Sequence, residues 1–259
     1  MRISIVTPVF NGARDIGKTL ASLGGSPVDL EHIVMDGGST DETCAIVSEH
    51  AARHPCRLVS QPDEGIYDAI AQGFSLATGD VFAWLNAGDF YLPWTLPAVE
   101  KIFEEHPEVD WITGIPSLFH ASRSTLEVSL YAPVYSRLLV RRGWHNGAHL
   151  DFIQQESTFW RRSLWERSGA SALLKGQGRG RGYAMDFHLW RRFAEHARLY
   201  TVASVLAGFA ITPGQISERH RVRYFAECGV SSPPARSNRW LMILFRVYST
   251  LRARECLRV

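Results

Sequence analysis

The first 115 residues alternate between short apolar runs and segments with helical spacing, and this rhythm most constrains the fold. The expected strands are Ile3–Val6, His32–Met35, Arg57–Ser60, Val81–Leu85 and Asp110–Thr113. The expected helices are Ala13–Leu23, a helix from Ser39 to about His50, Ile66–Ala77 and Thr95–Glu105. Repeated strand–helix units predict a mostly parallel α/β sheet with helices on both faces.

After about residue 116 this rhythm changes. We expect strand and loop over Ser117–Tyr131, helices over Val134–Arg142 and Tyr183–Glu195, and strands over Leu199–Ile211. The Gly/Arg-rich stretch at 176–182 reads as a flexible loop. A hinge at 231–234 precedes a final helix from about residue 236, so the chain is predicted to end in a helical extension.

Charge is distributed unevenly along a chain of ordinary globular composition. The net charge of the 259 residues is +2, but residues 219–259 hold nine arginines against two glutamates, about +7. The first 218 residues therefore carry about −5. Such a chain is neither disordered nor built to bind nucleic acid. The four cysteines form no C-x-x-C pair, and no leader or membrane-spanning run is evident, so we expect a cytoplasmic protein.

Polar clusters follow the ends of three expected strands: Thr7-Pro8, Asp36-Gly37-Gly38-Ser39 and Asn86-Ala87-Gly88-Asp89. Ligands of parallel sheets bind at the carboxyl ends of the strands. Asp36 is suited to accept a hydrogen bond from a ribose hydroxyl, or it belongs to a turn that caps the next helix. Asp89 is suited to bind Mg²⁺ or Mn²⁺ through oxygen, or it belongs to a strand–helix turn.

Two further candidate sites place charged side chains beside apolar residues. Asp186 begins an otherwise apolar helix, where it is either a general base or a partner of the helix dipole. Arg161 and Arg162 follow an aromatic strand, where they contact either a pyrophosphate or surface acids. These alternatives stay open on the residues alone.

Taken together and in order, these segments resemble the family 2 glycosyltransferases, which are inverting enzymes of GT-A fold. The resemblance spans roughly residues 2–217. The segments that carry it are Thr7-Pro8-Val9-Phe10-Asn11, Met35–Thr43, Glu64–Ala69, Ala77–Asp80, Trp84–Asp89, Gln155–Phe159, Met185–Trp190, Gly208-Phe209 and Gly214–Ser217.

The resemblance implies a GT-A (Rossmann-like), mostly parallel sheet flanked by helices, with residues 1–217 as the glycosyltransferase domain. Within it, 1–115 would bind the nucleotide sugar and 116–217 would face the acceptor; 218–259 would be a basic amphipathic helical tail. The donor nucleotide would contact six residues: Thr7, Pro8, Phe10, Asp36, Asp68 and Asn86. Asp89 would hold a divalent metal, and Asp186 would be the catalytic base.

The implied reaction is a single displacement from a nucleoside-diphosphate sugar, with UDP expected, to a glycan or lipid-linked acceptor in surface polysaccharide or glycolipid synthesis. Asp186 would deprotonate the acceptor hydroxyl. Mn²⁺ or Mg²⁺ on Asp89, assisted by Arg161, Arg179 or Arg181, would neutralise the diphosphate. Two positions depart from the family pattern: Gly88 replaces an acid, and Thr212 stands where a histidine often occurs.

Two other functions compete with this one. A catalytically silent protein that binds nucleotide or glycan would keep the fold. The possible metal ligands lost at Gly88 and Thr212 favour this alternative. A Rossmann oxidoreductase or methyltransferase is excluded because no G-x-G-x-x-G follows the first strand. Residues 236–259 either dock on the body or in a homodimer, or they bind the anionic inner face of a membrane as an interfacial helix.

Overall fold

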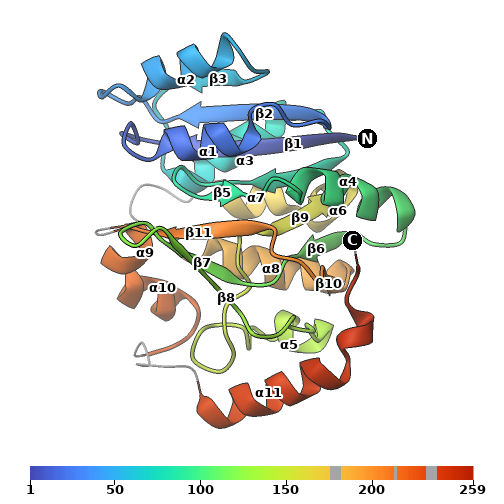
Figure 1. Cartoon of the computed structure of the whole chain (residues 1–259). Coiled ribbons are helices and arrows are strands. Elements are labelled where there is room, and N and C mark those ends of the chain that lie inside the picture. Colours follow the sequence, from blue (N-terminus) through green and yellow to red (C-terminus); the bar gives the residue numbers. More distant parts are fainter. Residues whose placement is uncertain (176–181, 213–214, 232–237, 259) are drawn as a thin grey trace.

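A seven-stranded sheet forms the centre of the computed structural model, which describes residues 1–175, 182–212, 215–231 and 238–258 (Figure 1). Its strand order is β10-β6-β9-β4-β1-β2-β3, and β9 alone runs antiparallel to its neighbours. The mostly parallel sheet predicted from the sequence is therefore confirmed. Its strands are β1 (Arg2–Val9), β2 (Asp29–Asp36), β3 (Arg57–Ser60), β4 (Val81–Trp84), β6 (Trp111–Thr113), β9 (Thr158–Arg161) and β10 (Leu199–Thr201).

Helices cover both faces of this sheet, because its strands are buried on both sides and alternate side chains need apolar partners. On one face Val6 and Met35 pack against α3 (Ile66–Leu76) and α8 (Met185–His196). The other face packs against three helices: α1 (Ile16–Leu23), α2 (Thr43–Ala51) and α4 (Thr95–Glu105). Shorter helices complete the layers: α5 (Arg137–Arg141), α6 (Arg162–Ser168) and α7 (Ala170–Leu174).

A second, four-stranded sheet lies beside the carboxyl end of β4. It has the order β5-β11-β7-β8. Its strands are β5 (Phe90–Tyr91), β7 (Ser117–His120), β8 (Thr125–Val128) and β11 (Ala207–Ile211). Because β5 begins directly after Asp89, the pairing of β5 with β11 holds the end of the 86–89 turn against the body.

The chain ends in helices, as predicted: α9 (Ile216–Arg219), α10 (Arg221–Glu227), α11 (Arg239–Leu251) and a 3₁₀ turn, Ala253–Glu255. The Asn238 side chain accepts hydrogen bonds from the backbone N–H groups of Trp240 and Leu241, which fixes the start of α11. The predicted start at 236 and the predicted hinge fall largely outside the described residues. Within the described ranges, every helix is too short or too polar to span a membrane.

Most predicted boundaries lie within three residues of the observed ones, and β3 and α4 agree at both ends. The first helix starts at Ile16 rather than Ala13 because the preceding turn is tied to the next strand–helix connection. There Asp41 accepts a hydrogen bond from the Ala13 N–H at 3.1 Å, and Thr43 Oγ1 accepts one from the Gly12 N–H at 2.9 Å. These contacts fix the two turns that flank the carboxyl ends of β1 and β2.

Candidate functional site

Asp36 lies at the carboxyl end of β2 with one carboxylate oxygen fully bonded and the other open. Oδ2 accepts hydrogen bonds from the Gly38 and Ser39 N–H groups and, at 2.7 Å, from the Ser60 hydroxyl. Burial raises the pKa of Asp36, but the hydrogen bonds outweigh it and lower that pKa. Oδ1 is buried without a partner in the described chain. The turn-capping and ligand-binding interpretations are thus compatible, since each uses a different oxygen.

Asp89 is held in the turn after β4 by hydrogen bonds to its side chain and to its backbone carbonyl. Its Oδ1 accepts a hydrogen bond from the Ala210 N–H on β11 at 2.8 Å, and its carbonyl accepts one from the Thr19 hydroxyl at 2.7 Å. Gly88 has φ +105°, as the turn interpretation expects. Burial raises the pKa of Asp89 although Ala210, Asn86 and Lys18 favour its charged form. A cation bound beside this buried carboxylate would stabilise its charged form and lower its pKa.

Glu156 is a second buried carboxylate at this edge of the sheet, and it is not among the predicted site residues. Its Oε1 is buried and has no hydrogen-bond partner among the described residues. Burial and the charges of Asp89 and Asp186 raise its pKa well above the usual range. Glu156 therefore lies within electrostatic reach of both predicted functional acids.

A pair of side-chain amides fixes the turn that carries Asp89 to the segment that carries Glu156. Asn86 Nδ2 donates to Gln155 Oε1 at 2.9 Å, and Gln155 Nε2 donates to the Trp84 carbonyl at 2.6 Å. Asn86 Oδ1 is also buried and unpartnered within the described chain. Because Gln155 directly precedes Glu156, these bonds hold the two carboxylate-bearing segments in register.

Asp186 occupies the first turn of α8, partly buried, where Tyr224 of α10 reaches it. The Tyr224 hydroxyl lies 3.2 Å from Oδ1 and 3.1 Å from Oδ2 of Asp186. Burial raises the pKa of Asp186 to about 6, opposed by the Phe187 N–H and the Tyr224 hydroxyl. Glu227, also on α10, accepts a hydrogen bond from the Ala184 N–H at 2.8 Å. A segment beyond residue 217 thus packs directly on the candidate base.

The predicted nucleotide-contact residues divide into exposed and buried ones. Phe10 is 56% exposed at the carboxyl end of β1. Thr7 is buried, with Oγ1 2.9 Å from His32 Nε2, and Pro8 is buried beside it. The Thr7 side chain therefore faces the interior, and a nucleotide contact of Thr7, which stays a prediction, would use its backbone. Asp68 accepts hydrogen bonds from the Glu64 N–H and the Gln72 side chain, within its own helix end.

The predicted diphosphate contact of Arg161 is corrected. Its guanidinium donates to the carbonyls of Val109, Phe103 and His106, the last two at the end of α4. Since Arg161 pairs with Val81, the first residue of β4, it lies at the edge of the sheet opposite Asp89. Arg179 and Arg181 lie outside the described residues. Lys18 of α1, which is not among the predicted site residues, is a cation that favours the charged form of Asp89.

The donor set at this edge fits a divalent cation of oxygen preference. No three His, Cys, Asp or Glu side chains within the described ranges form a ligand cluster. Mg²⁺ and Mn²⁺ bound with a diphosphate need only one or two protein carboxylates, however. Asp89, with the open oxygens of Glu156 and Asn86 near it, meets that need.

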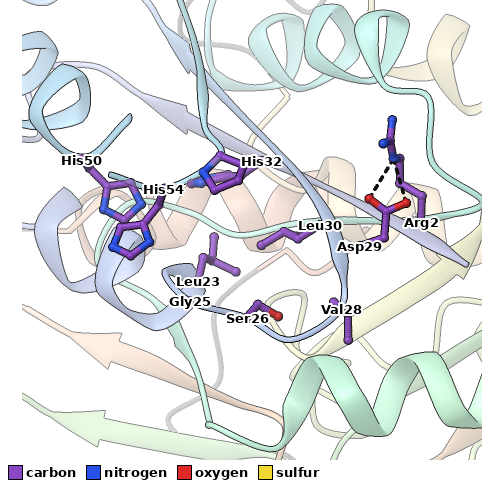
Figure 2. Close-up of a pocket in the computed structure, with 11 residues that line it drawn as sticks. Arg2, Leu23, Gly25, Ser26, Val28, Asp29, Leu30, His32, His50 and His54 are labelled. Atoms are coloured by element: carbon purple, nitrogen blue, oxygen red, sulfur yellow. Dashed lines mark hydrogen bonds and ion pairs between the residues drawn. The ribbon is translucent and has the colours of Figure 1, made fainter. Parts of the chain in front are cut away.

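A separate cavity of about 380 Å³ lies at the opposite edge, where β1 and β2 begin (Figure 2). Arg2 and Asp29 form an ion pair there, and the His50 and His54 rings lie 4.7 Å apart. His32 also lines it, and burial lowers the pKa of His32 to about 3, which keeps the ring neutral. This cavity is remote from Asp36 and Asp89. The candidate site is therefore assigned to the carboxyl edge of the sheet because of the acidic side chains there, and not because of a cavity volume.

Two functional candidates are absent from the sequence-based predictions. Glu156 carries a signal in the sequence, because an acid two residues before the apolar strand Thr158–Arg161 is a buried carboxyl group. Tyr224 carries none, because it lies in an arginine-rich segment that reads as a solvated tail. Only the tertiary packing of α10 on α8 brings its hydroxyl to Asp186.

Comparison with known proteins identifies the family of this chain. Residues 4–168 match the family described as Glycosyl transferase family 2. An uncharacterized glycosyltransferase of Nostoc sp. is 30% identical over 206 residues, covering 78% of this chain and 60% of that protein. The chain thus spans less than two thirds of that relative's length.

Solved structures with little sequence identity share the fold. TarS of S. aureus in complex with UDP-GlcNAc superposes with a TM-score of 0.62 at 15% identity, covering 83% of this chain and 60% of TarS. The mannosyltransferase PcManGT from Pyrobaculum calidifontis, in complex with GDP-Man and Mn²⁺, gives a TM-score of 0.60 at 21% identity and covers 96% of this chain and 69% of its own. These likenesses bear out the GT-A fold implied by the sequence resemblance.

Proposed function

Because this chain belongs to glycosyl transferase family 2, we propose that it is an inverting transferase that uses a nucleoside-diphosphate sugar, with UDP as the expected nucleotide. The acceptor is proposed to be a glycan or a lipid-linked sugar of the cell surface. The observation that carries this proposal is that the candidate site holds two sets of acids. Asp186, whose pKa is raised to about 6, is one, and the buried carboxyl groups of Asp89 and Glu156 are the other. An inverting displacement needs a base for the acceptor and charge neutralisation for the diphosphate.

We assign the base to Asp186. With a pKa of about 6 it is ionised at neutral pH, yet it is basic enough to take a proton as the acceptor oxygen attacks the anomeric carbon. The Tyr224 hydroxyl fixes the orientation of the carboxylate by donating to it. The attack and the departure of the diphosphate occur in one displacement, so no covalent glycosyl-enzyme forms.

We assign the donor to the carboxyl edge of β1, β2 and β4. Phe10 offers an exposed ring to the base, the open Oδ1 of Asp36 accepts from the base or ribose, and Asn86 offers a buried amide oxygen. Asp68 would act on the donor sugar nucleotide only indirectly, because its hydrogen bonds organise the start of α3. The backbone of Thr7 and Pro8, rather than the Thr7 side chain, forms the floor of this edge.

A divalent cation would be held by Asp89, with Glu156 and Asn86 near it, and would neutralise the diphosphate as it leaves. Within the protein, the Ala210 N–H keeps one oxygen of Asp89 in place and leaves the other for a ligand. Lys18 adds positive charge beside this carboxylate. The amide pair of Asn86 and Gln155 keeps the turn from moving when charge develops.

A thermal-shift screen of nucleoside-diphosphate sugars, each with and without Mn²⁺, tests the donor assignment. We expect a UDP-sugar with Mn²⁺ to raise the melting temperature most, because a ligand that binds the folded state stabilises it by mass action. Hydrolysis of that donor without acceptor then tests catalysis. A shift with no hydrolysis and no transfer to any acceptor would establish a silent nucleotide-binding protein instead.

Replacement of Tyr224 by Phe is expected to move the acidic limb of the pH–rate profile upward by about one pH unit. The hydroxyl donates to the charged form of Asp186, so its loss raises the pKa of the base above about 6. Transfer then falls several-fold near pH 6 and stays close to wild type at pH 8. Tyr248→Phe on α11 is the matched control, and an unmoved profile in Tyr224→Phe would refute the positioning role.

A further inference from the structure

Helix α11 has two apolar faces, of which only one packs on the body. On the inner face Phe245 is buried among Tyr131, Tyr135 and His145. On the outer face four large apolar side chains, here called the outer ridge, are exposed to solvent. They are Trp240 (76% exposed), Leu244 (65%), Val247 (52%) and Leu251 (80%).

The outer ridge is one continuous stripe. Its members are spaced by four, three and four residues, which places them along the same side of an α-helix. A stripe of this kind on a helix that is otherwise docked exposes apolar surface that water solvates poorly. It therefore indicates a surface that meets another apolar phase or partner.

The helix is fixed so that it cannot turn this ridge inward. The Asn238 N–H donates to the Ala148 carbonyl at 2.8 Å, before the helix begins. At its other end the Val134 N–H donates to the Ser249 hydroxyl at 3.0 Å, and Leu257 pairs with Val202. The outer ridge consequently stays exposed in the folded chain.

Arginines lie along one flank of α11 and beyond its end, and the nearest acid is already paired. Arg239 and Arg246, seven residues apart, lie on the same flank of the helix and are exposed. Arg254 is exposed beyond the helix end. Glu255 is the one acidic residue in the sequence from 228 to 259, and it forms ion pairs with Arg198 and Arg252. The surface is therefore apolar and positively charged at once.

We propose that the outer ridge of α11 is a membrane-docking surface that lies in the interface of a bilayer bearing anionic lipids. The apolar side chains would enter the boundary between headgroups and acyl chains, and the flanking guanidinium groups would contact lipid phosphates. Trp240 suits this boundary because its ring is apolar with one polar N–H. In Figure 1 α11 forms the end of the molecule opposite α2 and β3, so it is accessible to a planar surface.

A second copy of the chain is a less suitable occupant. Pairing two outer ridges would bring Arg239 and Arg246 of both copies toward a shared interface, where like charges repel. The acid that could offset them, Glu255, is occupied within its own chain. An anionic lipid surface supplies the complementary charge that a second copy lacks.

Co-sedimentation of the full chain with phosphatidylcholine vesicles, with and without phosphatidylglycerol, tests the proposal. We expect binding only to the anionic vesicles and release by high salt. Trp240→Gln with Leu244→Gln should weaken binding about tenfold or more, through lost apolar burial. Arg239→Gln with Arg246→Gln should weaken it about fivefold for each arginine.

Matched controls lie at the other end of the molecule or on another sheet. Val128→Gln on β8 and Arg57→Gln on β3 replace exposed residues of the same kinds and should leave binding unchanged. Wild-type protein that stays in the supernatant with anionic vesicles would overturn the proposal. A dimer that the ridge variant disperses, without vesicle binding, would assign the ridge to a second copy. Asp186→Asn should bind vesicles normally, so this test is independent of the transferase proposal.

Discussion

Replacement of Asp186 by Asn is expected to abolish sugar transfer, lowering kcat by about 10³-fold or more, while donor binding persists. General-base catalysis contributes about 10²–10⁴-fold, and Asn lacks a basic oxygen of suitable pKa. The side chain keeps its size and still accepts a hydrogen bond from Tyr224, so the site stays organised. Kinetics with a donor found by the thermal-shift screen, together with donor affinity by calorimetry, measure both quantities.

The same variant is expected to melt at a higher temperature at pH 7 to 8. In the folded chain the pKa of Asp186 rises from 3.8 to about 6, so the folded state binds its proton more tightly than the unfolded state does. The associated stability is complete below about pH 4 and is lost as the pH rises through about 6. Asn stays neutral and avoids this loss, so the difference in melting temperature disappears at acidic pH.

Glu195→Gln is the matched control for Asp186→Asn. Glu195 is exposed near the end of the same helix and interacts with Arg192. We expect unchanged transfer and little change in melting temperature, because exposed ion pairs contribute little. If Asp186→Asn transfers sugar at a rate within tenfold of wild type, the base is another group and the proposed mechanism fails.

The sheet could be predicted because its determinants are local. Apolar runs such as Val81–Leu85, followed by helical spacing and polar turns, specify strand–helix units without reference to distant residues. The position of Asp36 and Asp89 at one edge then follows from the parallel arrangement. The family resemblance supplied the GT-A fold, which the family match and the solved structures bear out.

The parts of the candidate site that were missed depend on contacts between distant segments. Arg161 looked free to meet a phosphate, but β9 runs antiparallel and takes its guanidinium to α4. Thr7 turned inward because His32 lies beside it on β2. Tyr224 reaches Asp186 only because α10 folds back onto α8. None of these pairings has a periodic signal in the sequence.

Asp89 should determine whether donor binding responds to metal. In wild type we expect Mn²⁺ to tighten binding of a UDP-sugar about tenfold or more, because the buried Asp89 carboxylate gains a cation to pair with. In Asp89→Asn the tightening should be absent, and transfer should fall by at least about 100-fold. The Asn side chain still accepts from the Ala210 N–H, so the turn keeps its shape.

Calorimetric titration of the donor across a series of Mn²⁺ concentrations measures this coupling in both proteins. Asp29→Asn, at the opposite edge of the sheet, removes the same charge from an exposed carboxylate and should behave like wild type. Glu156→Gln should weaken the response to Mn²⁺ in part, since Glu156 has a buried oxygen without a partner among the described residues and interacts electrostatically with Asp89. Equal donor affinities with and without Mn²⁺ in wild type would eliminate the metal site and assign diphosphate neutralisation to side-chain cations, of which Lys18 acts directly on Asp89.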